Sequence, residues 1–210
     1  MQVVGLTGNI GSGKSTIAKA FTALGIPVFN SDEEAKKAYA LPSIQHNVRE
    51  ILGSEKNPKE SPQEGSSKGP AEGIHLDFTK DTWKSEIASI IFSNTEKRLR
   101  LESLIHAFVQ NEFIRWKAFQ HSTYVIRESA LANSFQPENC DWLIEVVADE
   151  TTRQQRVLKR SEISPEDFAK RNAIQQRNMS FPIECTFKIS NNDRDFVLPE
   201  ILKIHEQLIG

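Results

Sequence analysis

The sequence has few cysteines and no long apolar run. Its 210 residues include only two cysteines, Cys140 and Cys185. They lack C-x-x-C spacing and no histidine array accompanies them, so neither metal binding nor redox chemistry is indicated. No apolar run approaches the ~18 residues of a membrane-spanning helix, and the predicted strand after Met1 leaves no room for a signal peptide. We therefore expect ordinary thiols in a reducing cytosol, a cytoplasmic protein and no membrane partner.

The sequence also lacks an excess of charge of either sign. Lysine and arginine total 26 against 28 aspartates and glutamates, which gives a formal net charge of −2. A nucleic-acid-binding domain is normally strongly basic, so no nucleic-acid partner is expected. Basic residues cluster at 97–100 and 153–160, and such runs are usually a solvent-exposed helix face. The length suits one α/β domain with insertions and a sizeable core.

A glycine-rich motif lies near the start of the chain. An apolar, β-prone run at residues 3–6 is followed by three glycines within six residues, and the spacing from Gly8 to Ser15 fits the phosphate-binding P-loop, G-x-x-x-x-G-K-[ST]. Glycines let successive backbone N–H groups turn toward an anion, and the following helix adds its positive end. The alternative is a glycine-rich turn with an incidental lysine. The position between a predicted strand and a predicted helix favours the P-loop.

The P-loop predicts that the protein binds a nucleoside triphosphate. Lys14 would reach the β- and γ-phosphates, and the Ser15 hydroxyl would ligate Mg²⁺. ATP and Mg²⁺ are therefore the expected cofactors. The residues expected to hold the nucleotide in this segment are Asn9, Ile10, Gly11, Ser12, Gly13, Lys14, Ser15 and Thr16.

The rest of the chain has the pattern of an α/β domain. Further strands are expected at 28–29, 124–126, 142–147 and 186–190, and helices at 17–24, 33–40, 42–53, 82–92, 95–119, 151–160, 164–177 and 196–208. A strand–loop–helix–strand unit of this length implies a parallel sheet with right-handed crossovers. The expected fold class is α/β, a P-loop NTPase fold with a five-stranded parallel sheet flanked by helices, a helical substrate-binding insertion and a helical lid.

A single domain is expected over residues 1–210. Its parts are a core at about 1–50, 122–150 and 184–210, a helical substrate-binding region with a polar loop at about 51–121, and a lid at about 151–183. Residues 54–73 are rich in Lys, Glu, Pro, Ser and Gly, which predicts a disordered or loosely ordered surface loop.

Two acidic residues stand at the ends of predicted strands. Ligands of open parallel sheets bind beyond the carboxyl ends of the strands, so Asp32 and Glu128 are expected to face the site that Lys14 creates. Asp32 is a candidate general base, although Ser31 or Asp32 could simply cap the following helix. Glu128 is a candidate anchor for Mg²⁺ through water. The alternative for Glu128 is a surface acid at the edge of its strand.

Basic residues in the predicted lid suggest phosphoryl transfer. Arg156, Arg160 and Arg171 could close over the nucleotide, neutralise the charge on the γ-phosphate oxygens and exclude water. Water exclusion matters most to a kinase, which also needs a base for the acceptor hydroxyl, and Asp32 is placed for that role. These features predict a small-molecule kinase. The expected catalytic groups are Lys14, Asp32, Arg156 and Arg160, with Arg171 binding the nucleotide.

One histidine lies in the long helix predicted at 95–119. His106 stands among apolar residues, where a histidine is usually a core residue with a satisfied hydrogen bond. The alternative is a contact with the substrate. The inner side of the same helix is expected to include Leu99.

Several segments of the chain are similar to the dephospho-coenzyme A kinase family, whose members phosphorylate the ribose 3′-hydroxyl of dephospho-CoA. The strongest matches are VGLTGNIGSGKST and LGIPVFNSDEEAKK. Weaker ones are His106, the strand leading to Glu128, the lid segment QQRVLKR and Asn191. The resemblance covers nearly the whole length outside residues 54–73.

The resemblance implies an ATP-dependent kinase that converts dephospho-CoA to CoA, the last step of CoA biosynthesis. On this resemblance Asp32 accepts the proton of the 3′-hydroxyl, and Lys36 lies near the substrate phosphates where the family usually has arginine. His106 would contact the substrate, and Asn191 would contact the nucleotide. The small-molecule partner is then dephospho-CoA, and we expect a monomer or a weak homo-oligomer.

Besides Lys36, the sequence departs from the family at four further places. Asn30 and Thr186 replace aspartates, Ala107 replaces a proline, and residues 132–134 replace Leu-Phe-Glu, which removes an acid. Lys14, Ser15 and Asp32 are unaffected, so the departures bear on acceptor binding and turnover rather than on nucleotide binding. Two alternatives stay open: another P-loop kinase of a nucleoside, nucleotide or small hydroxylated metabolite, and a nucleotide-binding regulatory protein that no longer catalyses.

Overall fold

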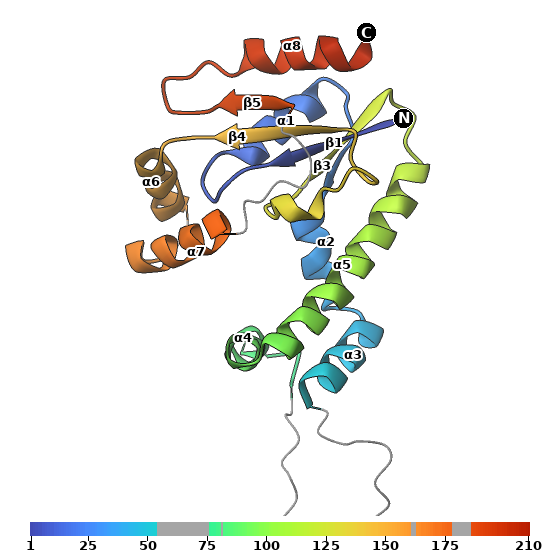
Figure 1. Ribbon diagram of the computed structural model, residues 1–210, viewed down its shortest axis with the longest axis vertical. Coiled ribbons are helices and arrows are strands. Elements are labelled where there is room, and N and C mark those ends of the chain that lie inside the picture. Colours follow the sequence, from blue (N-terminus) through green and yellow to red (C-terminus); the bar gives the residue numbers. More distant parts are fainter. Residues whose placement is uncertain (54–75, 81, 161–162, 178–185) are drawn as a thin grey trace, which may run out of the picture. The chain divides into compact units, whose positions relative to one another are not determined.

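The computed structural model describes residues 1–53, 76–80, 82–160, 163–177 and 186–210 (Figure 1). The chain divides into two compact units. The first unit consists of Met1–Asp32 and Phe113–Gly210, and the second unit of Glu33–Glu112. The polar loop expected at 54–73 lies outside the described residues, and the division into core, insertion and lid stays a prediction.

The first unit is built on a parallel sheet of five strands. The strands are β1 (Gln2–Thr7), β2 (Val28–Asn30), β3 (Tyr124–Glu128), β4 (Trp142–Val147) and β5 (Phe187–Ser190). Their order is β2-β3-β1-β4-β5, and every neighbouring pair is parallel. The central strands β1 and β3 are almost wholly buried, as strands of a sheet covered on both faces are. The expected five-stranded parallel sheet is confirmed.

Several helices belong to the first unit. They are α1 (Lys14–Ala23), α6 (Glu150–Arg160), α7 (Pro165–Arg177) and α8 (Leu198–Ile209), with a 3-10 turn at Ala132–Ser134. One core cluster joins the buried sides of α1 and α8 to strand residues such as Leu6, Ile126 and Ile144. The helix α1 ends just before Gly25, whose φ of 81° is the left-handed conformation that commonly stops a helix.

The second unit is helical over its described residues. It contains α3 (Pro42–Gly53), α4 (Trp83–Ser93) and most of α2 (Ser31–Ala38) and α5 (Thr95–Ala118). The rings of Tyr39 and Trp83 lie 4.9 Å apart, and Lys97 Nζ donates a hydrogen bond to the Leu52 carbonyl at 2.9 Å. Across the residues that the structure covers, we find no helix that combines the length and the apolar character needed to span a membrane.

The element bounds agree with the sequence expectations to within about three residues. Two side chains of α5 do not lie where the sequence predicts them. Leu99 is 56% exposed, so its expected place on the inner side of the helix is wrong. His106 is exposed, so the core interpretation of this histidine is wrong as well. The apolar spacing of a 24-residue helix identifies the helix, whereas the side that is covered at each turn depends on what packs there.

Candidate active site

The loop between β1 and α1 is shaped to receive an anion. Gly11 and Gly13 have φ values of 81° and 93°, a conformation that side chains with a Cβ rarely adopt. A Cβ on Gly13 would lie 2.1 Å from Asn191 Nδ2, and one on Gly11 would lie 2.5 Å from the Arg153 carbonyl oxygen. The buried Ser12 hydroxyl has no hydrogen-bond partner among the described residues. This cradle at the N-terminus of α1 fits a phosphate group.

Lys14 is the cation at the centre of this loop. Its Nζ donates a hydrogen bond of 2.6 Å to the Gly8 carbonyl, which curls the side chain back over the loop. Burial lowers the pKa of Lys14, the Asp32 and Glu128 carboxylates oppose that shift, and Arg160 adds to it. The ammonium therefore lies in a partly desolvated site shared by two acids and a second cation, where charge-assisted contacts are strong.

A cavity of about 230 Å³ opens beside the loop. It is lined by Ile10, Gly11, Gly13, Lys14, Ser15, Asp32, Glu128, Ala130, Arg160 and Gln175. The first unit thus brings together residues from the P-loop, the ends of β2 and β3, and the helices α6 and α7. Cationic, acidic and backbone donor groups converge here, which is the chemistry that phosphoryl transfer requires.

For each of the two acids of the cavity, the structure contradicts an alternative role. Glu128 is only 6% exposed and accepts a hydrogen bond of 3.4 Å from Asn30 Nδ2, so the interpretation as a surface acid is wrong. The helix α2 begins at Ser31, which places Asp32 inside its first turn rather than at the N-cap. Asn30 and Glu128 face each other across β2 and β3. An aspartate at position 30 would set two like charges side by side there, whereas Asn30 donates a hydrogen bond.

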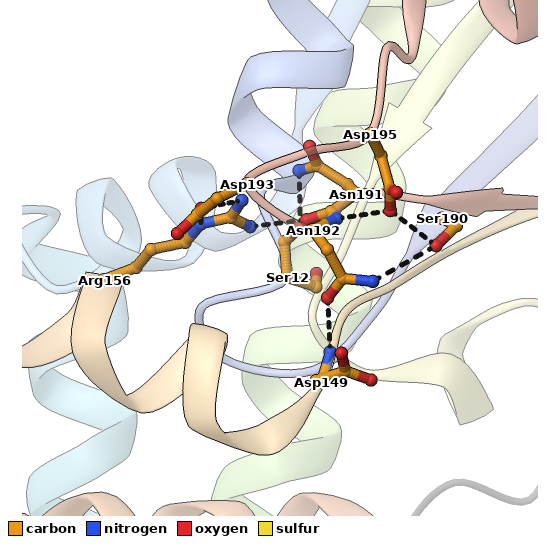
Figure 2. A network of polar contacts seen from close by, with 8 residues as sticks. All are labelled: Ser12, Asp149, Arg156, Ser190, Asn191, Asn192, Asp193 and Asp195. Atoms are coloured by element: carbon orange, nitrogen blue, oxygen red, sulfur yellow. Dashed lines mark hydrogen bonds and ion pairs between the residues drawn. The ribbon is translucent and has the colours of Figure 1, made fainter.

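Asn191, at the end of β5, contacts the P-loop directly. Its Nδ2 donates a hydrogen bond of 2.8 Å to the Ser12 carbonyl, and its own carbonyl accepts one of 2.7 Å from Arg156 Nη1 (Figure 2). Arg156 also forms an ion pair of 2.8 Å with Asp193. Arg156 was expected to close over the nucleotide, but its guanidinium holds the turn after β5 and is not among the residues that line the cavity.

The turn after β5 is held by its own polar contacts. Asp195 Oδ2 accepts hydrogen bonds from the Asn192 backbone N–H at 2.7 Å and from Ser190 Oγ at 2.8 Å (Figure 2). These bonds lower the pKa of Asp195. Asn192 Oδ1 in turn accepts from the Asp149 backbone N–H at 2.9 Å, which ties the turn to the start of α6. The turn is therefore a fixed support for Asn191 and the P-loop.

A buried arginine joins the P-loop to both lid helices. Arg153 is 4% exposed, and its Nη1 donates to the Ile10 carbonyl at 3.3 Å and to Asn172 Oδ1 on α7 at 2.7 Å. Its Nε donates to the Ala148 carbonyl at 3.1 Å. The interpretation of residues 153–160 as a solvent-exposed face is therefore wrong at Arg153. Its spacing of four residues from the buried Val157 was the signal in the sequence.

Comparison with known proteins identifies the family. A family model described as dephospho-CoA kinase matches residues 2–53 and 83–194. The chain belongs to the dephospho-CoA kinase family. A dephospho-CoA kinase from Porphyromonas gingivalis is 28% identical over 209 residues, covering 98% of this chain and 94% of that protein.

Solved structures support the same fold for this dephospho-CoA kinase family member. A crystal structure of a protein from Thermus thermophilus superposes with a TM-score of 0.77 at 21% identity, covering 100% of this chain and 98% of that one. A dephospho-CoA kinase from Campylobacter jejuni superposes with a TM-score of 0.58 at 20% identity, covering 99% and 98%. At these identities the likeness concerns the fold, and it agrees with the P-loop kinase fold expected from the sequence.

Other residues expected at the site stay predictions. Lys36 and His106 are exposed residues of the second unit, and Arg171 is exposed on α7. None of these three is among the residues that line the cavity of this family member. Gln175, which does line it, was missed because nothing in the local sequence of α7 marks one glutamine out; only the fold brings it to the P-loop.

Proposed function

We propose that this family member transfers the γ-phosphoryl group of ATP to the ribose 3′-hydroxyl of dephospho-CoA and so forms CoA and ADP. The observation that carries the proposal is that Lys14, Asp32, Glu128 and Arg160 line one cavity beside the glycine cradle. A nucleotide-binding loop alone would fit many proteins. An acid facing the P-loop lysine supplies the base that an alcohol acceptor needs.

The nucleotide phosphates would be held by the P-loop. Backbone N–H groups of this loop and the N-terminus of α1 would bind the anion, apart from the N–H groups of Ile10, Ser12 and Thr16, which donate within the protein. Lys14 would exchange its contact with the Gly8 carbonyl for the β- and γ-phosphates. Arg160 would neutralise charge on the γ-phosphoryl oxygens from the lid side. Arg156 and Asn191 support this arrangement through the Ser12 carbonyl, to which Asn191 donates.

Asp32 is the proposed general base. It takes the proton of the 3′-hydroxyl while that oxygen forms a bond to the γ-phosphorus, and the bond from the phosphorus to the β–γ bridging oxygen breaks to release ADP. The electrostatic environment suits this role, because the Asp32 carboxylate is close enough to the Lys14 ammonium to act on its pKa. General base catalysis of this kind typically contributes about 10²–10⁴-fold to the rate.

Ser15 and Glu128 would hold Mg²⁺. The ion prefers oxygen ligands and is usually bound through one or two carboxylates together with substrate phosphates and water. The described residues contain no group of three or more His, Cys, Asp or Glu side chains that could hold a metal, and a site of this kind needs none. When bound, the ion would neutralise charge on the phosphates. A cytoplasmic location and a monomer or weak homo-oligomer complete the proposal.

The test is a coupled assay of ADP formation over a panel of acceptors. Dephospho-CoA should stimulate ADP release, and mass spectrometry should find CoA phosphorylated at the ribose 3′-position. A nucleoside monophosphate and shikimate serve as alternative acceptors. Stimulation by either of these and not by dephospho-CoA would reject the proposed acceptor, and ATP binding without any phosphorylated product would indicate a regulatory nucleotide-binding protein.

A further inference from the structure

The helix α7 touches the P-loop through one glutamine. The backbone N–H of Ile10 donates a hydrogen bond of 2.6 Å to Gln175 Oε1. Gln175 also lines the cavity, together with Lys14 and Arg160. The side chain is thus in contact with the anion-binding loop and open to the space that the transferred phosphoryl group would fill.

The same P-loop residue is held from its other side. The Ile10 carbonyl accepts from Arg153 Nη1 at 3.3 Å, and Arg153 Nη1 also donates to Asn172 Oδ1 at 2.7 Å. Asn172 and Gln175 are three residues apart and therefore share one face of α7. Since Arg153 and Asn172 are both 4% exposed, these contacts are shielded from water. The helix α7 therefore contacts the Ile10 N–H directly, through Gln175, and is linked to the Ile10 carbonyl through Arg153 of α6.

A neutral acceptor is suited to this contact. The Ile10 N–H belongs to a loop whose donors attract anions, so a carboxylate on α7 would compete for the charge of the nucleotide, whereas a carboxamide oxygen satisfies the N–H without adding charge. We propose that Gln175 is a positioning residue, which seats α7 on the P-loop and so keeps water out of the cavity. This inference rests on the proposed kinase function. It adds a residue that favours attack on the γ-phosphorus by the acceptor hydroxyl over attack by water.

Loss of the contact has a defined chemical consequence. With α7 unseated, a water oxygen forms the bond to the γ-phosphorus, the bond to the β–γ bridging oxygen breaks, and ADP, inorganic phosphate and a proton are released. A kinase suppresses this reaction by excluding water. The rate of ATP hydrolysis without an acceptor therefore reports on the seating of α7.

The experiment compares three variants of the full-length protein. Gln175→Met keeps the length of the side chain but removes the strong acceptor, and Gln175→Glu keeps an acceptor oxygen. The matched control is Gln176→Met, because Gln176 is the next residue on α7 and is exposed. The readouts are the amide proton chemical shift of Ile10 in the nucleotide-free protein, ATP hydrolysis at saturating ATP without acceptor, and the melting temperature.

Gln175→Met should move the Ile10 amide proton upfield and raise acceptor-free hydrolysis about tenfold, the factor that one typical hydrogen bond represents. Gln175→Glu should keep the Ile10 amide proton from moving upfield and keep hydrolysis low at saturating ATP, but it should raise the KM for ATP because its carboxylate repels the nucleotide. Gln176→Met should match wild type in all of these. If Gln175→Met equals Gln176→Met in hydrolysis, the inference is wrong. Neither readout uses dephospho-CoA, so a wild-type protein that fails to phosphorylate that acceptor overturns the proposed function separately.

Discussion

Replacing Arg153 by methionine removes the side chain that joins α6, α7 and the P-loop. Three hydrogen bonds are lost, to the Ala148 carbonyl at 3.1 Å, the Ile10 carbonyl at 3.3 Å and Asn172 Oδ1 at 2.7 Å. Each acceptor left without a partner in a buried place costs about 1–3 kcal/mol. Burial lowers the pKa of Arg153, so its removal also relieves a desolvation cost. We expect a net loss of about 3 kcal/mol.

Differential scanning calorimetry of the nucleotide-free protein measures this loss. For a chain of this size about 3 kcal/mol corresponds to a fall of about 6–12 °C in melting temperature. Lys159→Met is the matched control, because Lys159 is an exposed cation on the same helix and should change stability by less than about 0.5 kcal/mol. Arg153→Lys keeps the charge but loses the planar guanidinium group, so its melting temperature should lie between those of Arg153→Met and Lys159→Met. Equal melting temperatures for Arg153→Met and Lys159→Met would refute the reasoning.

Three further predictions concern single side chains. Lys14→Ala should lower kcat by at least about 10²-fold in the coupled assay, because the cation that contacts the transferring phosphoryl group is lost; near-wild-type turnover would contradict its role. Burial raises the pKa of the Cys140 thiol to about 11. The contribution of the protonated thiol to the free energy of unfolding is therefore complete below its ordinary pKa of about 9. This contribution is lost as the pH rises through about 11. The stability difference between wild type and Cys140→Ala, measured by urea unfolding, should therefore shrink by up to about 3 kcal/mol across that interval, and a constant difference would exclude the effect. Tyr124→Phe removes the 2.7 Å hydrogen bond between Tyr124 Oη and His205 Nδ1 and should cost about 1 kcal/mol in the same unfolding experiment, whereas an unchanged midpoint would show that the bond contributes nothing.

The sheet and the phosphate cradle could be predicted because their signals are local. A β-prone run, the glycine spacing and a helical pattern identify the P-loop within about 20 residues. The rule that parallel strands present their carboxyl ends at one edge then brings Asp32 and Glu128 toward Lys14, and the cavity contains all three. Family membership agrees with that prediction.

The side-chain contacts of the lid helices could not be predicted, because their partners are distant in sequence. Gln175 bonds Ile10 across 165 positions, and Arg153 reaches the same residue across 143. Whether an arginine on α6 points to solvent, as expected for Arg153, or to a carbonyl depends on what packs there. Arg156 is a similar case: its contacts with the turn after β5 could not be predicted, and its expected contact with the nucleotide stays a prediction.

The most direct test of the account is the turnover of Asp32→Asn with ATP and dephospho-CoA. The substitution keeps the shape of the side chain but removes the proposed proton acceptor, which lines the cavity together with Lys14. We expect kcat to fall by about 10²–10⁴-fold, with the KM for ATP and the melting temperature close to those of the wild type. Full activity in Asp32→Asn would show that this carboxylate takes no proton from the acceptor, and the proposed mechanism would be wrong.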